Sequence, residues 1–186
     1  MNINWVMSDS AVLEYGTDIE KLKDIGSIWG GWRTWRNCGT DNVICNDTSK
    51  AVDLIQRDFH KTCNFYVPKN AYVTLDRPPG VQLFEGEFKF EVDNQDELVA
   101  IHLVSGRSDI VLLFGFDWRR VNPGADRLVE HRAQNYRNTV KQALTDNPDV
   151  QWVLIDHPDG ELMPEIARLG NLTQDTLPNV LAMLSS

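Results

Sequence analysis

The chain has 186 residues, of which 42% are hydrophobic and 24% are charged. This length suits one domain with a hydrophobic core, and the composition excludes collagen-like, disordered and disulfide-scaffold proteins. The formal net charge of -9 argues against binding of nucleic acid through its phosphates, which requires clustered Lys and Arg side chains.

Targeting and cysteine features predict a cytoplasmic protein. Residues 1–15 contain no basic segment followed by an apolar run, so no secretory signal is expected. No apolar stretch approaches the ~20 residues that a membrane span needs. The three cysteines include no CxxC pair, which favours reduced thiols that pack in the interior, and the four histidines show no metal-ligand spacing.

The first half of the chain alternates short apolar strands with helices. The predicted strands are residues 3–7, 41–45 and 64–67. The predicted helices are residues 18–23 and residues 47–60, the second with Asp47 as its N-cap. Residues 25–40 are rich in Gly, Trp and Arg and show no clean period, so we expect a loop there.

The second half contains the clearest unit. Apolar and charged residues alternate within residues 82–92, which predicts a half-buried strand that is antiparallel or at a sheet edge. A helix over 93–105 precedes an apolar strand over 110–116, and such a strand is typical of a parallel sheet covered on both faces. The remaining predictions are a helix over 128–144, a strand over 152–155 and two short C-terminal helices. We therefore predict one three-layer, Rossmann-like α/β domain over residues 1–186, with a largely parallel sheet and one antiparallel or edge strand.

Ligands of such sheets bind beyond the carboxyl ends of the strands, so polar residues just past the predicted strands are candidates. They are Ser8, Asp9, Ser10, Asn46, Asp47, Asp117, Arg119, Arg120, Asp156 and His157. The motifs GxGxxG, GxxxxGKS/T, GxSxG and HExxH are absent from the chain. This argues against the usual dinucleotide sites, P-loop NTPases, α/β-hydrolases and zinc proteases.

His131 is the first candidate for catalysis. It lies near the start of the predicted helix after Asp117 and off the apolar stripe, where a neutral imidazole would accept a proton from an attacking hydroxyl. The alternative is a surface histidine at a helix start. Asp117 would take sugar or ribose hydroxyls or a metal, or it caps a loop. Arg119 and Arg120 would hold phosphate, or they lie on the surface.

Two further segments are candidates for ligand binding. The helix after Asn46 and Asp47 offers an anion or ribose site at its N-terminus, unless Asp47 only caps it. In the loop of residues 29–36, aromatic and cationic side chains would stack on a base or sugar and hold a phosphate, or would seal the sheet edge or a partner surface. The candidates in this loop are Trp32, Arg33, Trp35 and Arg36.

The run from Asp96 to Asp117 has the pattern of a helix, a short turn and an apolar strand that ends in Gly115-Phe116-Asp117. An earlier strand ends in Cys45-Asn46, and His131 opens the helix after the Gly-x-Asp loop. In this order the chain resembles the bacterial sialyltransferases that use CMP-sialic acid and their motility-associated DUF115-type relatives, some of which phages carry. The resemblance implies a nucleotide contact by Asn46 and a role as catalytic base for His131.

Two segments depart from the family's pattern. The first strand ends in Ser8-Asp9-Ser10 where the family has Gly-Pro-Ser, and residues 91–94 lack the family's Ser-Gly pair. We therefore carry two hypotheses. In the first, a small glycosyltransferase-like protein binds a nucleotide or nucleotide-sugar donor, with Ser8 to Ser10, Asn46 and Asp47 on the nucleotide. In the second, a non-catalytic protein of the same fold binds a ligand or partner through residues 29–36, and homo-oligomer formation is left open.

Overall fold

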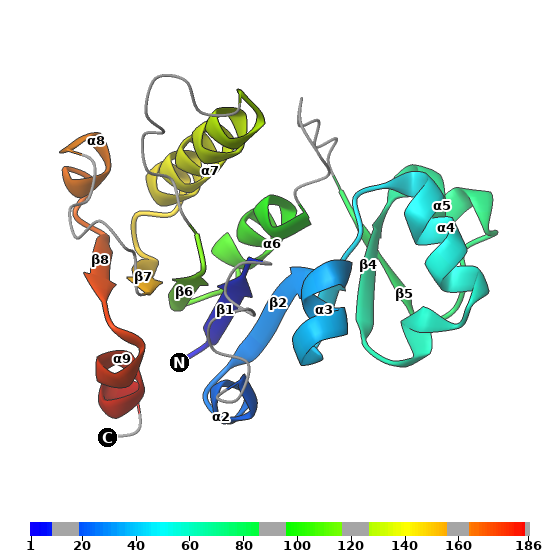
Figure 1. Cartoon of the computed structure of the whole chain (residues 1–186), viewed down its shortest axis with the longest axis horizontal. Coiled ribbons are helices and arrows are strands. Elements are labelled where there is room, and N and C mark those ends of the chain that lie inside the picture. Colours follow the sequence, from blue (N-terminus) through cyan, green and yellow to red (C-terminus); the bar gives the residue numbers. More distant parts are fainter. Residues whose placement is uncertain (9–18, 86–95, 117–126, 156–163, 185–186) are drawn as a thin grey trace.

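The structure is a computed structural model that describes residues 1–8, 19–85, 96–116, 127–155 and 164–184. Its strands are β1 (Ile3–Met7), β2 (Ser27–Gly31), β3 (Asn42–Ile44), β4 (Asn64–Pro68), β5 (Val81–Phe84), β6 (Ile110–Phe114), β7 (Gln151–Ile155) and β8 (Leu172–Asp175). They form one sheet in the order β5-β4-β3-β2-β1-β6-β7-β8, and every neighbouring pair runs parallel (Figure 1). The prediction of an α/β fold with a mainly parallel sheet is confirmed.

Helices connect the strands and cover both faces of the sheet. They are α2 (Ile19–Lys23), α3 (Trp32–Cys38), α4 (Thr48–Gln56), the 3-10 helix η1 (Phe59–Lys61), α5 (Lys69–Thr74), α6 (Asp96–Ser105), α7 (Arg127–Asp146), α8 (Pro164–Ala167) and α9 (Leu177–Leu184). Helices α6, α7 and α8 pack on one face, over Val6 and Trp152. Helices α2 and α9 pack on the other face, over Trp5 and Leu112. Successive side chains of a strand point to opposite faces, so a fully apolar strand such as β6 serves both cores at once.

The chain reverses its direction of travel across the sheet between β1 and β6. From β1 it adds β2 to β5 on one side, and it then returns through α6 to place β6, β7 and β8 on the other side. β1 pairs directly with β6, with Met7 opposite Phe114. Helix α6 crosses back over β1, β2 and β3 and also packs against α7, so nearly all of it is buried. The beginning of α6 therefore lies over the centre of the sheet, at its carboxyl edge.

The edge strand differs from its prediction in one respect. The strand expected within residues 82–92 is present as β5, over Val81–Phe84, and it forms one edge of the sheet. It runs parallel to β4, so the described part of the chain shows no antiparallel strand. Residues 86–95 lie outside the described ranges. The alternating residues that led to the prediction, 87–92, are among them, so the alternation stays untested.

Residues 25–40 form regular structure, and the prediction of a loop there was wrong. Ser27–Gly31 is the parallel strand β2 and Trp32–Cys38 is the helix α3. Two of the five residues of this strand are glycines, so the sequence shows no alternation of apolar and polar side chains there. Both glycines lie in close packing: a Cβ on Gly30 would lie 3.0 Å from Thr34 Cβ, and one on Gly31 would lie 3.1 Å from Asp96 Cβ. Gly31 itself has an ordinary extended backbone, with φ -76° and ψ 168°.

Three other elements escaped prediction or were shortened. Helix α5 and strand β8 were not predicted, and β8 lies between the two short C-terminal helices. The helix expected to reach residue 60 ends at Gln56, because Asp58 has a positive φ of 61° that interrupts the helix before η1. Among the described helices, none is long and apolar enough to cross a membrane.

Candidate functional site

Ser8 closes the junction between the two central strands. Its backbone N–H donates to Phe114 O at 3.0 Å, and its hydroxyl donates to Gly115 O. Only 1% of Ser8 is exposed. Gly115 accepts this contact with a φ of 77°, a conformation that other residues adopt at a cost. Ser8 thus connects the end of β1 to the end of β6, and its hydroxyl already donates its hydrogen bond to a backbone carbonyl.

The end of β3 is held to the start of α6. The backbone N–H of Asn46 donates to Asp96 Oδ1 at 2.7 Å. Next to it, Asp47 is the N-cap of α4, because its Oδ1 accepts a hydrogen bond of 2.9 Å from Lys50 N. The predicted N-cap at Asp47 is therefore confirmed. The Asn46 side chain is only half buried, so it lies at the surface of this edge.

Two buried carboxylates begin α6, and sequence reasoning missed their role. Asp96 and Glu97 are only 6% and 7% exposed. Glu97 Oε1 accepts a hydrogen bond of 2.6 Å from the hydroxyl of Tyr136 in α7, whose ring packs edge-on against Phe116 at 5.2 Å between centroids. Negative side chains in the first turn also favour the helix dipole. The sequence feature that could have indicated this burial is a pair of adjacent acidic residues at the start of a helix whose other residues are mostly apolar.

The charge of Asp96 also affects the pKa of the nearby Cys45 thiol. Burial first, and then the charges of Asp96 and Asp47, raise the pKa of the Cys45 thiol far above its ordinary value. The thiol therefore stays protonated and inert at neutral pH, which agrees with a packing role. Cys63, on the same side of the sheet, has a pKa raised by burial to about 11.

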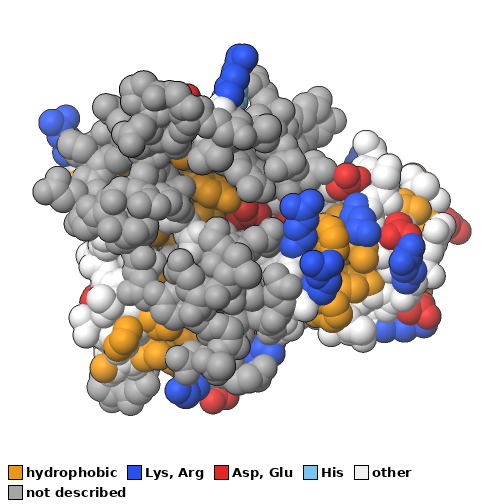
Figure 2. All heavy atoms as spheres, viewed as in Figure 1, with side chains coloured by type: hydrophobic (Ala, Val, Ile, Leu, Met, Phe, Trp, Pro, Cys, Tyr) orange, Lys and Arg blue, Asp and Glu red, His pale blue; other side chains and the backbone are white. Residues whose placement is uncertain are grey.

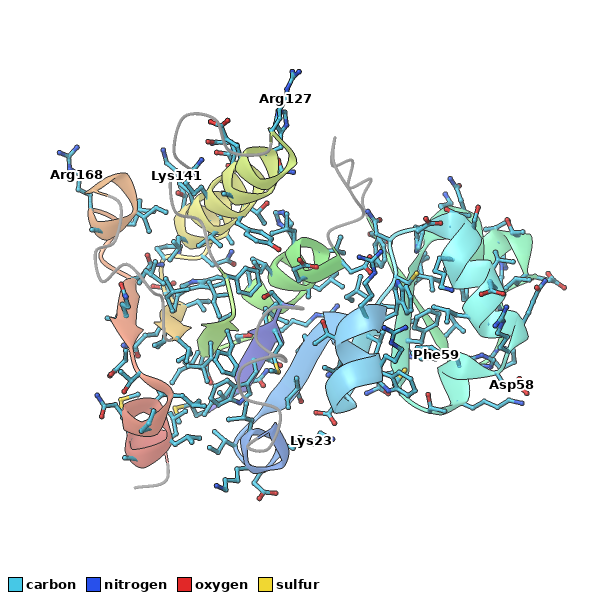
Figure 3. All side chains as sticks on the ribbon, viewed as in Figure 1. Lys23, Asp58, Phe59, Arg127, Lys141 and Arg168 are labelled. Carbon is cyan, nitrogen blue, oxygen red and sulfur yellow. The ribbon has the colours of Figure 1, made fainter. Side chains whose placement is uncertain are left out.

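His131 lies in the second turn of α7 and is half buried. Its helix follows β6, whereas Asn46 follows β3, and β2 and β1 lie between those strands. Three strand spacings separate the two strand ends by about 14 Å. A ligand that touches both residues would have to span the centre of the carboxyl edge. The first residue of α7, Arg127, is exposed and extends away from the sheet (Figure 3).

Several predicted site residues lie outside the described ranges. They are Asp9, Ser10, Asp117, Arg119, Arg120, Asp156 and His157. The convergence of Asp117 with His131 and Asn46 therefore stays a prediction.

The two tryptophans of α3 have different surroundings. Trp35 is half buried and packs against Phe59, with 4.5 Å between ring centroids, at the side of a hydrophobic cluster; Phe59 is labelled in Figure 3. Trp32 is partly exposed and contacts two cations: Lys50 Nζ lies 4.7 Å and Arg33 Cζ lies 5.8 Å from its ring centroid. Lys and Arg side chains gather around hydrophobic ones over α3 and α4 (Figure 2). We call Trp32, Arg33, Arg36 and Lys50 the basic surface.

A hollow of about 400 Å³ lies at the opposite, amino-terminal edge of the sheet. It is formed by the ends of α6 and α7 and the turns that follow them, including Arg107, Asp146 and Asp149. None of the described candidates from the sequence lines it. Within the described ranges, no group of three or more His, Cys, Asp or Glu side chains would hold a metal ion.

Comparison with known proteins leaves the family open. No family model and no curated protein matches the chain. A solved structure of orotidine 5'-monophosphate decarboxylase from Metallosphaera sedula aligns over 100% of this chain and 97% of that one. The sequence identity is 12% and the TM-score is 0.29, values that do not establish a common fold.

Proposed function

We propose that this chain is a Rossmann-like protein that binds a nucleotide or nucleotide-sugar at the carboxyl edge of its sheet and acts as a small glycosyltransferase. The observation that carries the proposal is the reversal of strand order between β1 and β6. Open parallel sheets bind ligands at such a reversal, beyond the strand ends. Ser8 lies at this reversal, and Asn46 and Asp96 lie at the same edge of the sheet, beside the ends of β3 and β2.

The polar groups suit hydroxyls better than phosphate at the centre of this edge. Asp96 and Glu97 are acceptors of hydrogen bonds, and two carboxylates at the start of α6 repel an anion. Asn46 presents both a donor and an acceptor from its amide. A ribose or sugar ring, which both donates and accepts through its hydroxyls, therefore fits this part of the edge.

The proposed chemistry transfers a sugar from its phosphate to an acceptor hydroxyl. The acceptor oxygen forms a bond to the anomeric carbon, and the bond from that carbon to the phosphate oxygen breaks with its electron pair on the phosphate. In this proposal His131 takes the proton of the acceptor hydroxyl. Asp117 and the arginines Arg119 and Arg120 keep their predicted roles toward the sugar and the leaving phosphate.

The test is thermal unfolding in the presence of CMP, UDP, GDP and their sugar conjugates. A ligand at one hundred times its dissociation constant stabilises the native state by about 2.7 kcal/mol, so the melting temperature rises. Asn46→Ala should remove most of the rise. Asp149→Asn, an exposed change at the opposite edge, should keep it. The proposal fails if none of these compounds stabilises the protein.

A second candidate is a non-catalytic protein that binds a partner through the basic surface. The observation in its favour is the exposed group of cations around Trp32 (Figure 2). Trp35 is unsuitable for testing it, because its loss would disrupt the core contact with Phe59. Trp32→Ala should change the sedimentation coefficient if the chain self-associates through this surface. An unchanged coefficient would count against self-association.

A further inference from the structure

The basic surface lies next to the proposed ligand edge. Trp32 directly follows Gly31, the last residue of β2, and Gly31 lies against Asp96. Lys50 lies in the first turn of α4, four residues after Asn46. Both the aromatic ring and the lysine are therefore joined by a few residues of rigid chain to the groups that would hold the sugar hydroxyls.

The charges of this surface are only partly balanced. Lys50 Nζ pairs with Asp53 at 3.2 Å, and the same carboxylate also pairs with Arg57 at 2.8 Å. The hydrogen bond from Lys50 is the first cause of the lowered pKa of Asp53. In the described part of the chain, neither Arg33 nor Arg36 forms an ion pair. Two carboxylates, Asp47 and Asp53, thus lie next to Lys50, whereas Arg33 and Arg36 add two exposed cations, in a chain whose overall charge is -9.

The cation–π contacts give this surface a defined arrangement. Arg33 and Lys50 come from different helices, and both lie within 6 Å of the Trp32 ring centroid, the range of favourable attraction. Such contacts restrict the conformations of the long Arg and Lys side chains before a ligand binds. Less side-chain entropy is therefore lost when they bind an anion. Arginine adds a planar fork that matches two phosphate oxygens.

We propose that Arg33, Lys50 and Trp32 form a subsite for the phosphates that join nucleoside and sugar, in addition to the contacts predicted for Arg119 and Arg120, and that these phosphates are a diphosphate. The assignment rests on the proposed function, which supplies the ligand. Arg33, Arg36 and Lys50 match the larger negative charge of a diphosphate better than the single phosphodiester of a CMP-sugar. The ligand would lie beyond the end of β2, with its hydroxyls toward the half-buried Asn46 and its diphosphate over Trp32.

The test is isothermal titration with three probes: inorganic pyrophosphate, UDP and uridine. The variant is Arg33→Gln/Lys50→Gln. Its matched control, Lys141→Gln/Arg168→Gln, removes the same charge from exposed positions in α7 and just after α8, across the molecule (Figure 3). We expect the first double variant to weaken pyrophosphate and UDP about tenfold or more, because charge-assisted hydrogen bonds are lost. Uridine binding should be unchanged, and the control should stay within about twofold for all three probes.

The outcomes separate this inference from the proposed function. If pyrophosphate binds and needs Arg33 and Lys50 while uridine does not bind, the anion subsite stands and the nucleotide proposal fails. If uridine binds but pyrophosphate does not, or if both double variants weaken pyrophosphate equally, the subsite is wrong and the nucleotide proposal survives. Binding of UDP no tighter than that of uridine would overturn the assignment to a diphosphate.

Discussion

The close approach of α6 to the end of β2 gives the sharpest prediction about the site. In Gly31→Ala the new Cβ would lie 3.1 Å from Asp96 Cβ and 3.2 Å from Asp96 Oδ2. Favourable contacts between carbon atoms lie at about 3.5 to 4.0 Å, so the start of α6 must move by a few tenths of an ångström. That movement also strains the 2.7 Å hydrogen bond from Asn46 N.

The expected cost follows from two opposing effects. Overpacking a well-packed site costs about 1 to 3 kcal/mol. The backbone at Gly31, with φ -76°, is open to alanine, and replacing glycine restricts the unfolded chain, which returns about 0.4 to 1 kcal/mol. We therefore expect Gly31→Ala to lower the free energy of unfolding by between about 0 and 2.6 kcal/mol, and to be about 1 to 3 kcal/mol less stable than a glycine-to-alanine variant without the overpacking.

The matched control is Gly106→Ala, just past the end of the same helix. A Cβ there would meet nothing within 4 Å, so this variant should be as stable as the parent or slightly more stable. Urea unfolding followed by circular dichroism measures both. Equal stabilities for Gly31→Ala and Gly106→Ala would refute the close contact between β2 and α6.

Three further predictions concern stability. Tyr136→Phe removes the hydroxyl that donates to buried Glu97, and we expect it to lower the free energy of unfolding in urea by about 1.5 to 3 kcal/mol. The control Tyr72→Phe should lower it little, because the Tyr72 hydroxyl has no hydrogen-bond partner among the described residues. Equal losses in the two variants would contradict this prediction. Asp47→Ala removes the N-cap of α4 and should lower the free energy of unfolding by about 1 kcal/mol. Asp47→Asn should leave it nearly unchanged, because asparagine is also a good N-cap. An equally large loss in the Asn variant would show that capping is not the cause. Burial lowers the pKa of His102 below its ordinary 6.5, so the unfolded chain takes up the proton first and stability falls as the pH drops below about 6.5. His102→Gln should show a smaller loss of unfolding free energy between about pH 7 and pH 5, and an unchanged loss would contradict this sign.

The central strands were predictable because burial on both faces leaves a direct mark in the sequence. β1 and β6 are buried along their whole length, and their residues are almost all apolar. The start of α4 was equally clear, since an aspartate before a helical pattern is a common N-cap. These signals are local, and each lies within one element.

The features that sequence reasoning missed depend on partners far along the chain. The burial of Asp96 and Glu97 is compensated by Asn46, 50 residues before, and by Tyr136, 39 residues after. Acidic side chains are seldom buried without such partners, so a single sequence favours exposure. Likewise, the glycines of residues 25–40 favoured a loop, whereas Gly30 and Gly31 lie in a strand that packs closely against α3 and α6.

The most direct test of the account is an amide chemical-shift titration of the ¹⁵N-labelled protein with UDP. We predict that the perturbed amides cluster at the carboxyl edge, around Ser8, Gly31 and Asn46, and extend to Lys50. The result that would contradict the account is a cluster at the opposite edge, around Arg107 and Asp149, or no perturbation at millimolar UDP.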